Sequence, residues 1–230
     1  FENLSKRVIQ WENYLLGSLI SILKKRKIEL KNFNCCIEGN LPLGSGISSS
    51  SSLICGFIKG IDQLNNLNLN NDEILSISRE VEYDFIGLKG GIMDQFTIIN
   101  SKKNNLIFLN TIDNSAEFIK SDLGDYKLLL LNTNKKHNLS DSEYNKRVEE
   151  CQEALKIIND SGYKIKFLTQ IDVEELRKIQ NLMPDNIFNR ALYVIQENNR
   201  TIQSVEHLKN LDLKSLGNLM YSSHDGLRDL

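Results

Sequence analysis

Two glycines and a run of serines follow one another in residues 41–53, which have the sequence LPLGSGISSSSSL. Gly44 and Gly46 allow the backbone to approach an anion closely, and a helix that begins in the serine run offers unpaired N–H groups and a favourable dipole. The serine hydroxyls add hydrogen-bond donors or a metal ligand. The segment therefore predicts a phosphate cradle, with a flexible linker as the alternative. It is not a P-loop, because no lysine follows the second glycine.

A second pair of glycines precedes a carboxylate in residues 90–96, GGIMDQF. Phosphoryl transfer needs positioning, charge neutralisation and a carboxylate that orients or deprotonates the attacking hydroxyl. Asp94 fits that catalytic role, although an aspartate after two glycines is also a common turn residue. Glu82, or the competing Glu80, would bind a Mg²⁺ ion that bridges ATP phosphates; the alternative for both is a solvated surface acid.

The hydrophobic pattern predicts the elements that position these residues. Helices are expected over residues 5–26, over 48–63, and from Asp72 as the capping residue to about Phe85. Strand-like segments are expected at residues 33–38 and, as an antiparallel sheet, at 95–100, 105–110, 116–120 and 127–132.

Helical patterns dominate the rest of the chain, after a weak boundary near residues 133–140. They cover residues 140–160, 173–180, 187–208 and 212–221. The predicted fold class is therefore α+β.

The bulk composition excludes several classes of protein. The chain has 230 residues, 40% of them hydrophobic and 25% charged, with a net charge of −2. This charge argues against a protein that neutralises many nucleic-acid phosphates, and no apolar run approaches the roughly 18–20 residues of a membrane span. Because no signal peptide is visible and the cysteines lack metal-site spacing, a cytoplasmic protein with reduced thiols is expected. The cysteines are Cys35, Cys36, Cys55 and Cys151.

The motifs together resemble those of the galactokinases, which are GHMP small-molecule kinases. Residues 42–50, PLGSGISSS, are similar to the family's ATP motif P-x-G-x-G-L-S-S-S, and residues 91–95, GIMDQ, are similar to the galactokinase motif of the same letters. The resemblance covers nearly the whole chain. Further matching segments are residues 11–14, 132–139, 142–147, 189–192, 197–200 and 222–229.

This resemblance implies the GHMP kinase fold, with a ribosomal-protein-S5-like N-terminal lobe and an α+β C-terminal lobe. The N-terminal ATP-binding domain would cover residues 1–135 and the C-terminal domain residues 136–230, both partial. The family's N-terminal galactose-binding segment and its C-terminal glycine-rich motif are not found in the sequence. We therefore expect a galactokinase truncated at both ends.

The resemblance also implies a reaction, in which the γ-phosphate of ATP is transferred to the C1 hydroxyl of α-D-galactose with Mg²⁺. Asp94 would be the catalytic carboxylate, and Ser50 and Glu82 would be the metal ligands. Gly91, Asp94 and Tyr144 would contact the sugar. The ATP contacts would be Trp11, Tyr14, Gly44, Ser45, Gly46, Ile47, Ser48, Ser49 and Ser50. Trp11 and Tyr14 would line the adenine pocket, or alternatively belong to the core.

Two other functions stay open at this point. One is a kinase for N-acetylgalactosamine or for another C1 hydroxyl, and the other is a non-catalytic sensor of galactose and ATP. Ser51 and Ser52 replace two small residues, usually alanines, of the family motif, but the loop keeps its length. The expected partners are galactose and ATP, with neither nucleic acid nor membrane, and a monomer is favoured.

Overall fold

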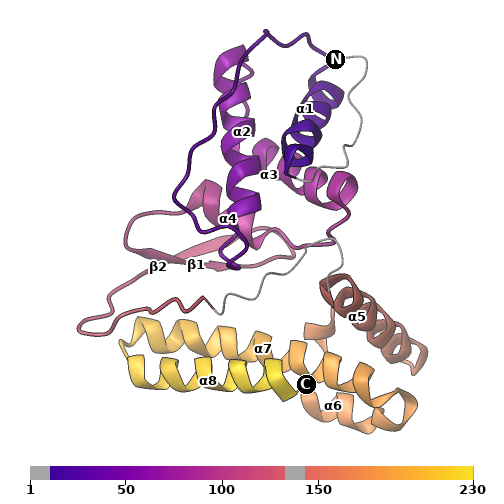
Figure 1. Cartoon of the computed structure of the whole chain (residues 1–230). Coiled ribbons are helices and arrows are strands. Elements are labelled where there is room, and N and C mark those ends of the chain that lie inside the picture. Colours follow the sequence, from indigo (N-terminus) through magenta and orange to yellow (C-terminus); the bar gives the residue numbers. More distant parts are fainter. Residues whose placement is uncertain (1–10, 133–142, 230) are drawn as a thin grey trace. The chain divides into compact units, whose positions relative to one another are not determined.

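The computed structural model describes residues 11–132 and 143–229, which fold into two compact units (Figure 1). Of the described residues, 11–103, 109–116 and 129–132 belong to the first unit, and 104–108, 117–128 and 143–229 belong to the second. The predicted domain boundary after residue 135 lies outside the described residues and stays a prediction. The start of the helix predicted from residue 5 also lies outside them.

The first unit is built from helices that share one hydrophobic core. These are α1 (Glu12–Arg26), α2 (Ser49–Asn65), α3 (Asn71–Glu80) and α4 (Met93–Asn100), together with a π-helix, η1 (Val81–Ile86), that continues α3. Ile22 of α1, Ile54 and Ile58 of α2 and Ile77 of α3 are all fully buried. Among residues 11–132 and 143–229, no helix is long and apolar enough to cross a bilayer.

Helix α3 begins with a capping box. The Asn70 side chain accepts a hydrogen bond from the Glu73 N–H over 2.9 Å, and the Glu73 carboxylate accepts one from the Asn70 N–H over 3.0 Å. This arrangement satisfies two N–H groups of the first turn. The prediction that Asp72 is the cap is therefore wrong; Asp72 lies in the first turn, where a negative charge also favours the helix dipole.

Three predicted strands are absent from the part of the chain that the structure describes. Residues 95–100 belong to α4, because Phe96 is buried one helical turn after Ile92, a spacing that fits a helix and not an alternating strand. Residues 33–38 and 127–132 are extended or irregular, and no neighbouring backbone pairs with them as a strand. The sheet consists of β1 (Asn105–Leu109) and β2 (Ala116–Lys120).

The second unit contains most of this β1–β2 pair and four α-helices. Hydrogen bonds at both ends, Asn110 N–H to Ser115 carbonyl and Ser121 N–H to Asn104 carbonyl, make the pair an antiparallel hairpin. Ile119 of the hairpin packs against Val205 of helix α7. The helices are α5 (Glu143–Asp160), α6 (Val173–Lys178), α7 (Asp185–Lys209) and α8 (Leu213–Asp229).

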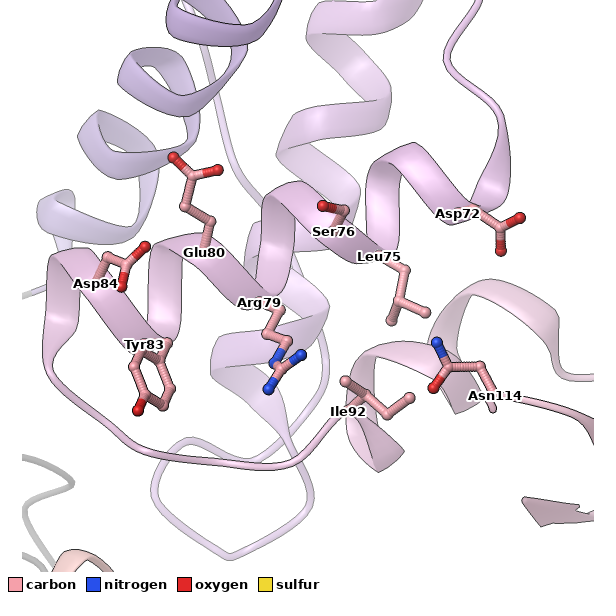
Figure 2. Close-up of a pocket in the computed structure, with 9 residues that line it drawn as sticks. All are labelled: Asp72, Leu75, Ser76, Arg79, Glu80, Tyr83, Asp84, Ile92 and Asn114. Carbon is pink, nitrogen blue, oxygen red and sulfur yellow. The ribbon is translucent and has the colours of Figure 1, made fainter. Parts of the chain in front are cut away.

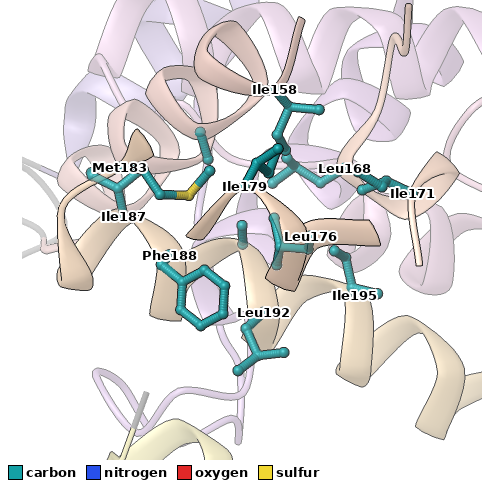
Figure 3. Packing of buried hydrophobic residues seen from close by; sticks show 12 residues of the cluster. Ile158, Leu168, Ile171, Leu176, Ile179, Met183, Ile187, Phe188, Leu192 and Ile195 are labelled. Atoms are coloured by element: carbon teal, nitrogen blue, oxygen red, sulfur yellow. The ribbon is translucent and has the colours of Figure 1, made fainter. Parts of the chain in front are cut away.

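The core of the second unit joins α5, α6 and α7 (Figure 3). Ile158 of α5 and Leu176 of α6 are fully buried, and they pack with Ile187 and Ile195 of α7. The four helices predicted after residue 140 are thus confirmed as elements. The predicted end of the last helix at residue 221 is wrong, because the helix continues through Gly226 to Asp229.

Candidate active site

The buried carboxylate of Glu82 is the centre of the site in the first unit. Only 7% of the residue is exposed. Its Oε1 accepts a hydrogen bond from the Ser51 hydroxyl over 2.7 Å, and its Oε2 accepts one from Nε2 of Gln95 over 2.5 Å. The site therefore joins η1 to α2 and α4, and the two bonds compensate the carboxylate for the water it has lost.

The π-helix η1 fixes the backbone of Glu82. The Glu82 carbonyl accepts hydrogen bonds from the N–H groups of Gly87 and Leu88, over 3.0 and 2.9 Å. Gly87 has a φ of 90°, a conformation that favours glycine, and it ends the element. Single-turn π-helices occur frequently at functional sites, where the widened turn redirects a side chain.

The charge of Glu82 influences its neighbours. Burial raises the pKa of Glu82; the hydrogen bonds from Ser51 and Gln95 oppose this rise, and the negative charge of Asp94 adds to it. Burial and the Glu82 charge also raise the pKa of Tyr14 in α1.

Asp94 lies in the first turn of α4, directly before Gln95. Asp94 is partly exposed, whereas Glu82 is buried. A Cβ atom added at Gly90 would lie 3.8 Å from Oε2 of Glu82, so the glycine segment runs beside this carboxylate. Because Gln95, the residue after Asp94, donates a hydrogen bond to Glu82, the predicted residues Glu82 and Asp94 lie near one another, the first buried and the second partly exposed.

The predicted phosphate cradle is an exposed loop that leads into α2. Gly44, Gly46 and Ser48 have positive φ angles of 69°, 74° and 60°. Ser48 is the N-cap residue of α2, and no side chain forms a cap hydrogen bond there. Such an end leaves N–H groups of the first turn available to an anion. A non-glycine residue in the left-handed region is a strained conformation of the kind found at ligand-binding sites.

The oxygen atoms of Glu82 and of the serines near it are of the kind that bind a magnesium ion. Mg²⁺ prefers oxygen ligands and commonly takes one or two carboxylates from the protein and the rest from phosphates and water. Glu82 supplies a carboxylate, and α2 supplies serine hydroxyls at its first turn. No group of three or more His, Cys, Asp or Glu side chains that could hold a metal occurs among the described residues, so the nucleotide would have to complete the ligand set.

Glu80, the alternative metal ligand, lies in different surroundings. Its carboxylate is 3.7 Å from the ammonium groups of Lys24 and Lys25. Glu80 also lines a pocket of about 450 Å³ on the outer side of α3 and η1, where Figure 2 shows it with Arg79 and Tyr83. The other lining residues are Asp72, Leu75, Ser76, Asp84, Ile92 and Asn114. Apart from Glu80, none of the predicted site residues lines this pocket.

The remaining predicted residues are dispersed. Trp11 is 52% exposed and precedes α1, while Tyr14 packs against the core of the first unit. Their role in an adenine pocket stays a prediction. Gly91 is exposed. Tyr144 belongs to α5 in the second unit, so its predicted sugar contact also stays a prediction.

Sequence reasoning missed two residues of the site, Ser51 and Gln95. Both could have been found from helical spacing. Ser51 precedes Ile54 and Cys55 by three and four residues and so begins the buried stripe of α2. Gln95 lies three residues after the buried Ile92. A polar residue in a buried helical stripe must find a partner, and here both find Glu82.

Comparison with protein families supports the predicted resemblance. Residues 13–102 match the model of the GHMP kinases N terminal domain. This segment contains the cradle, Glu82 and Asp94.

The similar curated proteins are galactokinases. The galactokinase of Thermotoga neapolitana is 36% identical over 225 residues, which cover 98% of this chain and 61% of that protein. The galactokinase of Clostridium tetani is 39% identical over 96% of this chain and 56% of its own length. The chain therefore spans less than two thirds of the length of these relatives.

A solved structure is also similar. The Lactococcus lactis galactokinase complexed with galactose is 31% identical and matches with a TM-score of 0.87, over 98% of this chain and 58% of that one. The predicted GHMP kinase fold is thereby confirmed.

Proposed function

Since this chain belongs to the GHMP kinase family, we propose that it catalyses the galactokinase reaction, the transfer of the γ-phosphate of ATP to the C1 hydroxyl of α-D-galactose. The observation that carries the proposal is the proximity of two unlike carboxylates. Glu82 is buried and hydrogen-bonded, and the neighbouring Asp94 is partly exposed. A kinase that phosphorylates a hydroxyl needs one acidic group for the metal and another for the hydroxyl.

Asp94 is the proposed catalytic carboxylate. It accepts the proton of the C1 hydroxyl as that oxygen bonds to the γ-phosphorus. The bond from the γ-phosphorus to the bridging oxygen breaks, and ADP leaves with its electron pair. Asp94 lies in the first turn of α4, at the helix end where the dipole favours acidic residues.

The cradle and the metal site hold the nucleotide in this proposal. The phosphates of ATP are bound by Gly44, Ser45, Gly46, Ile47, Ser48, Ser49 and Ser50. This assignment is supported by the exposed loop with three positive φ angles and by the uncapped start of α2. Ser50 and Glu82 bind Mg²⁺, which neutralises the charge of the transferring group when bound. Trp11 and Tyr14 contact the adenine.

Galactose is the proposed sugar because the relatives are galactokinases and the similar solved structure carries galactose. Gly91 and Tyr144 would contact it together with Asp94. The proposed domains are residues 1–135, which bind ATP, and 136–230. We also propose that the protein acts as a monomer in the cytoplasm, where ATP and Mg²⁺ are abundant.

The test is ADP release by the chain with MgATP and one of three sugars, galactose, N-acetylgalactosamine or glucose, or with no sugar. ADP release that requires galactose supports the proposal. If ADP release is faster with N-acetylgalactosamine, that sugar and not galactose is the substrate. Binding of galactose and ATP without turnover would favour the non-catalytic sensor.

A further inference from the structure

We propose that Ser51 and Gln95 are positioning residues that hold the carboxylate of Glu82 in the orientation that binds the metal ion. This inference rests on the proposed function, in which Glu82 is a ligand of Mg²⁺. It adds two residues that do not themselves contact substrate. We call the three residues the Glu82 clamp.

The clamp is fixed at both oxygens of the carboxylate. Ser51 donates to Oε1 over 2.7 Å from α2, and Gln95 donates to Oε2 over 2.5 Å from α4. Because the two donors belong to different helices, rotation of the carboxylate would break at least one bond. Each carboxylate oxygen keeps a second acceptor site, so the clamp leaves Glu82 able to bind a cation.

Both hydrogen bonds of the clamp are buried, and only one serine of the run takes part in them. Ser51 is 2% exposed and Gln95 is 1% exposed, so neither bond competes with bulk water. Within the run of serines from Ser48 to Ser52, Ser51 alone is buried. Ser51 is therefore the serine of the run that bonds to Glu82, and the Ser50 hydroxyl stays available to bind the nucleotide and its metal ion.

Gln95 carries an independent sign that the site is made for an additional group. Its Oε1 is buried and has no hydrogen-bond partner within the described part of the chain. Buried acceptors normally have a donor, which water often supplies. Mg²⁺ usually keeps several of its waters, and such a water would be a donor at this position.

The experiment measures Mn²⁺ binding in the presence of ADP, from the electron paramagnetic resonance signal of free Mn²⁺. Mn²⁺ is used because it takes the same oxygen ligands as Mg²⁺. Four variants are compared: Ser51→Ala, Gln95→Leu, Glu82→Gln and Ser52→Ala. Ser52→Ala is the matched control, since it removes a hydroxyl from the same turn of α2 outside the clamp. Circular dichroism checks that each variant is folded.

Loss of an outer partner of a metal ligand typically weakens metal binding about 10–100-fold. We expect Mn²⁺ binding to be about 10–100-fold weaker in Gln95→Leu and at least about 10-fold weaker in Ser51→Ala. In Ser52→Ala the affinity for Mn²⁺ should be unchanged. If Glu82→Gln loses Mn²⁺ but Ser51→Ala and Gln95→Leu bind as the unchanged chain does, the clamp is wrong and the metal site stands. If Glu82→Gln also binds normally, the proposed metal site itself is wrong.

Discussion

The Ser51 hydroxyl and the Glu82 carboxylate, 31 residues apart in the sequence, are joined by a buried hydrogen bond of 2.7 Å. Gln95 binds the other oxygen of the same carboxylate and directly follows Asp94. The start of α2, the π-helix and the first turn of α4 are thus tied together. The proposed metal ligand and the proposed catalytic carboxylate are therefore positioned by one network.

Replacing the proposed catalytic carboxylate should separate chemistry from binding. Asp94→Asn keeps the size of the side chain but cannot accept the proton, so phosphate transfer should fall by about 10²–10⁴-fold. MgATP binding, measured by calorimetry, should stay nearly unchanged. Asp84→Asn is the control, because Asp84 is an exposed carboxylate of η1 that lines the outer pocket. Equal turnover by both variants would remove Asp94 from the mechanism.

The cradle depends on the backbone conformation of Gly46. A Cβ atom at this position meets nothing within 4 Å, but φ is +74°. Gly46→Ala should therefore distort the loop, at a cost of about 1–2 kcal/mol, and weaken ATP binding. Gly56→Ala is the matched control, since Gly56 also has open space but lies in α2. Equal ATP affinity in the two variants would argue against the cradle.

The packing of α1 against η1 requires a glycine at residue 17. A Cβ atom there would lie 2.9 Å from Cδ1 of Phe85 and 3.0 Å from Cγ1 of Val81. Gly17→Ala should therefore destabilise the protein by about 1–3 kcal/mol, despite the better helix propensity of alanine.

The measurement for Gly17 is urea-induced unfolding. Gly60→Ala in α2, where a Cβ atom would meet nothing within 4 Å, should be neutral or stabilising by up to about 1 kcal/mol. Equal stability of the two variants would show that α1 and η1 are not packed as described.

A buried ion pair should make the second unit sensitive to acid. Burial alone would raise the pKa of Glu150, but hydrogen bonds from Arg190 and Arg147 outweigh it and hold the pKa below its usual value of 4.5. A lowered carboxyl pKa stabilises the fold above the usual value, and this contribution is lost as the pH falls through the folded-state pKa.

Glu150→Gln should thus lower the free energy of unfolding at neutral pH and flatten its decline below pH 4.5. Urea-induced unfolding at a series of pH values measures both effects. Glu153→Gln changes an exposed carboxylate of the same helix and serves as the control. If the free energy of unfolding of Glu150→Gln falls with pH as steeply as that of the unchanged chain, the pair with Arg190 does not stabilise the unit.

The sequence was sufficient for features that depend on local pattern. Helical spacing predicts α2 and α7, and both are present. The sequence motifs also point to the glycines and to the carboxylates Glu82 and Asp94, whose roles stay predictions. Strands were predicted less well, because a strand exists only where another backbone pairs with it. Apolar content alone therefore misassigned residues 95–100, which form α4. The role of Ser51 required the structure, since five consecutive serines look alike until the π-helix places Glu82 beside one of them.

The central claim is tested most directly by phosphorus NMR of the chain incubated with MgATP and galactose. The account predicts a sugar phosphate signal whose phosphorus couples to the anomeric proton at C1, with an equal amount of ADP. The signal should be strongly reduced with Asp94→Asn. Phosphate on another carbon, ADP formed with only inorganic phosphate, or no consumption of ATP would contradict the account.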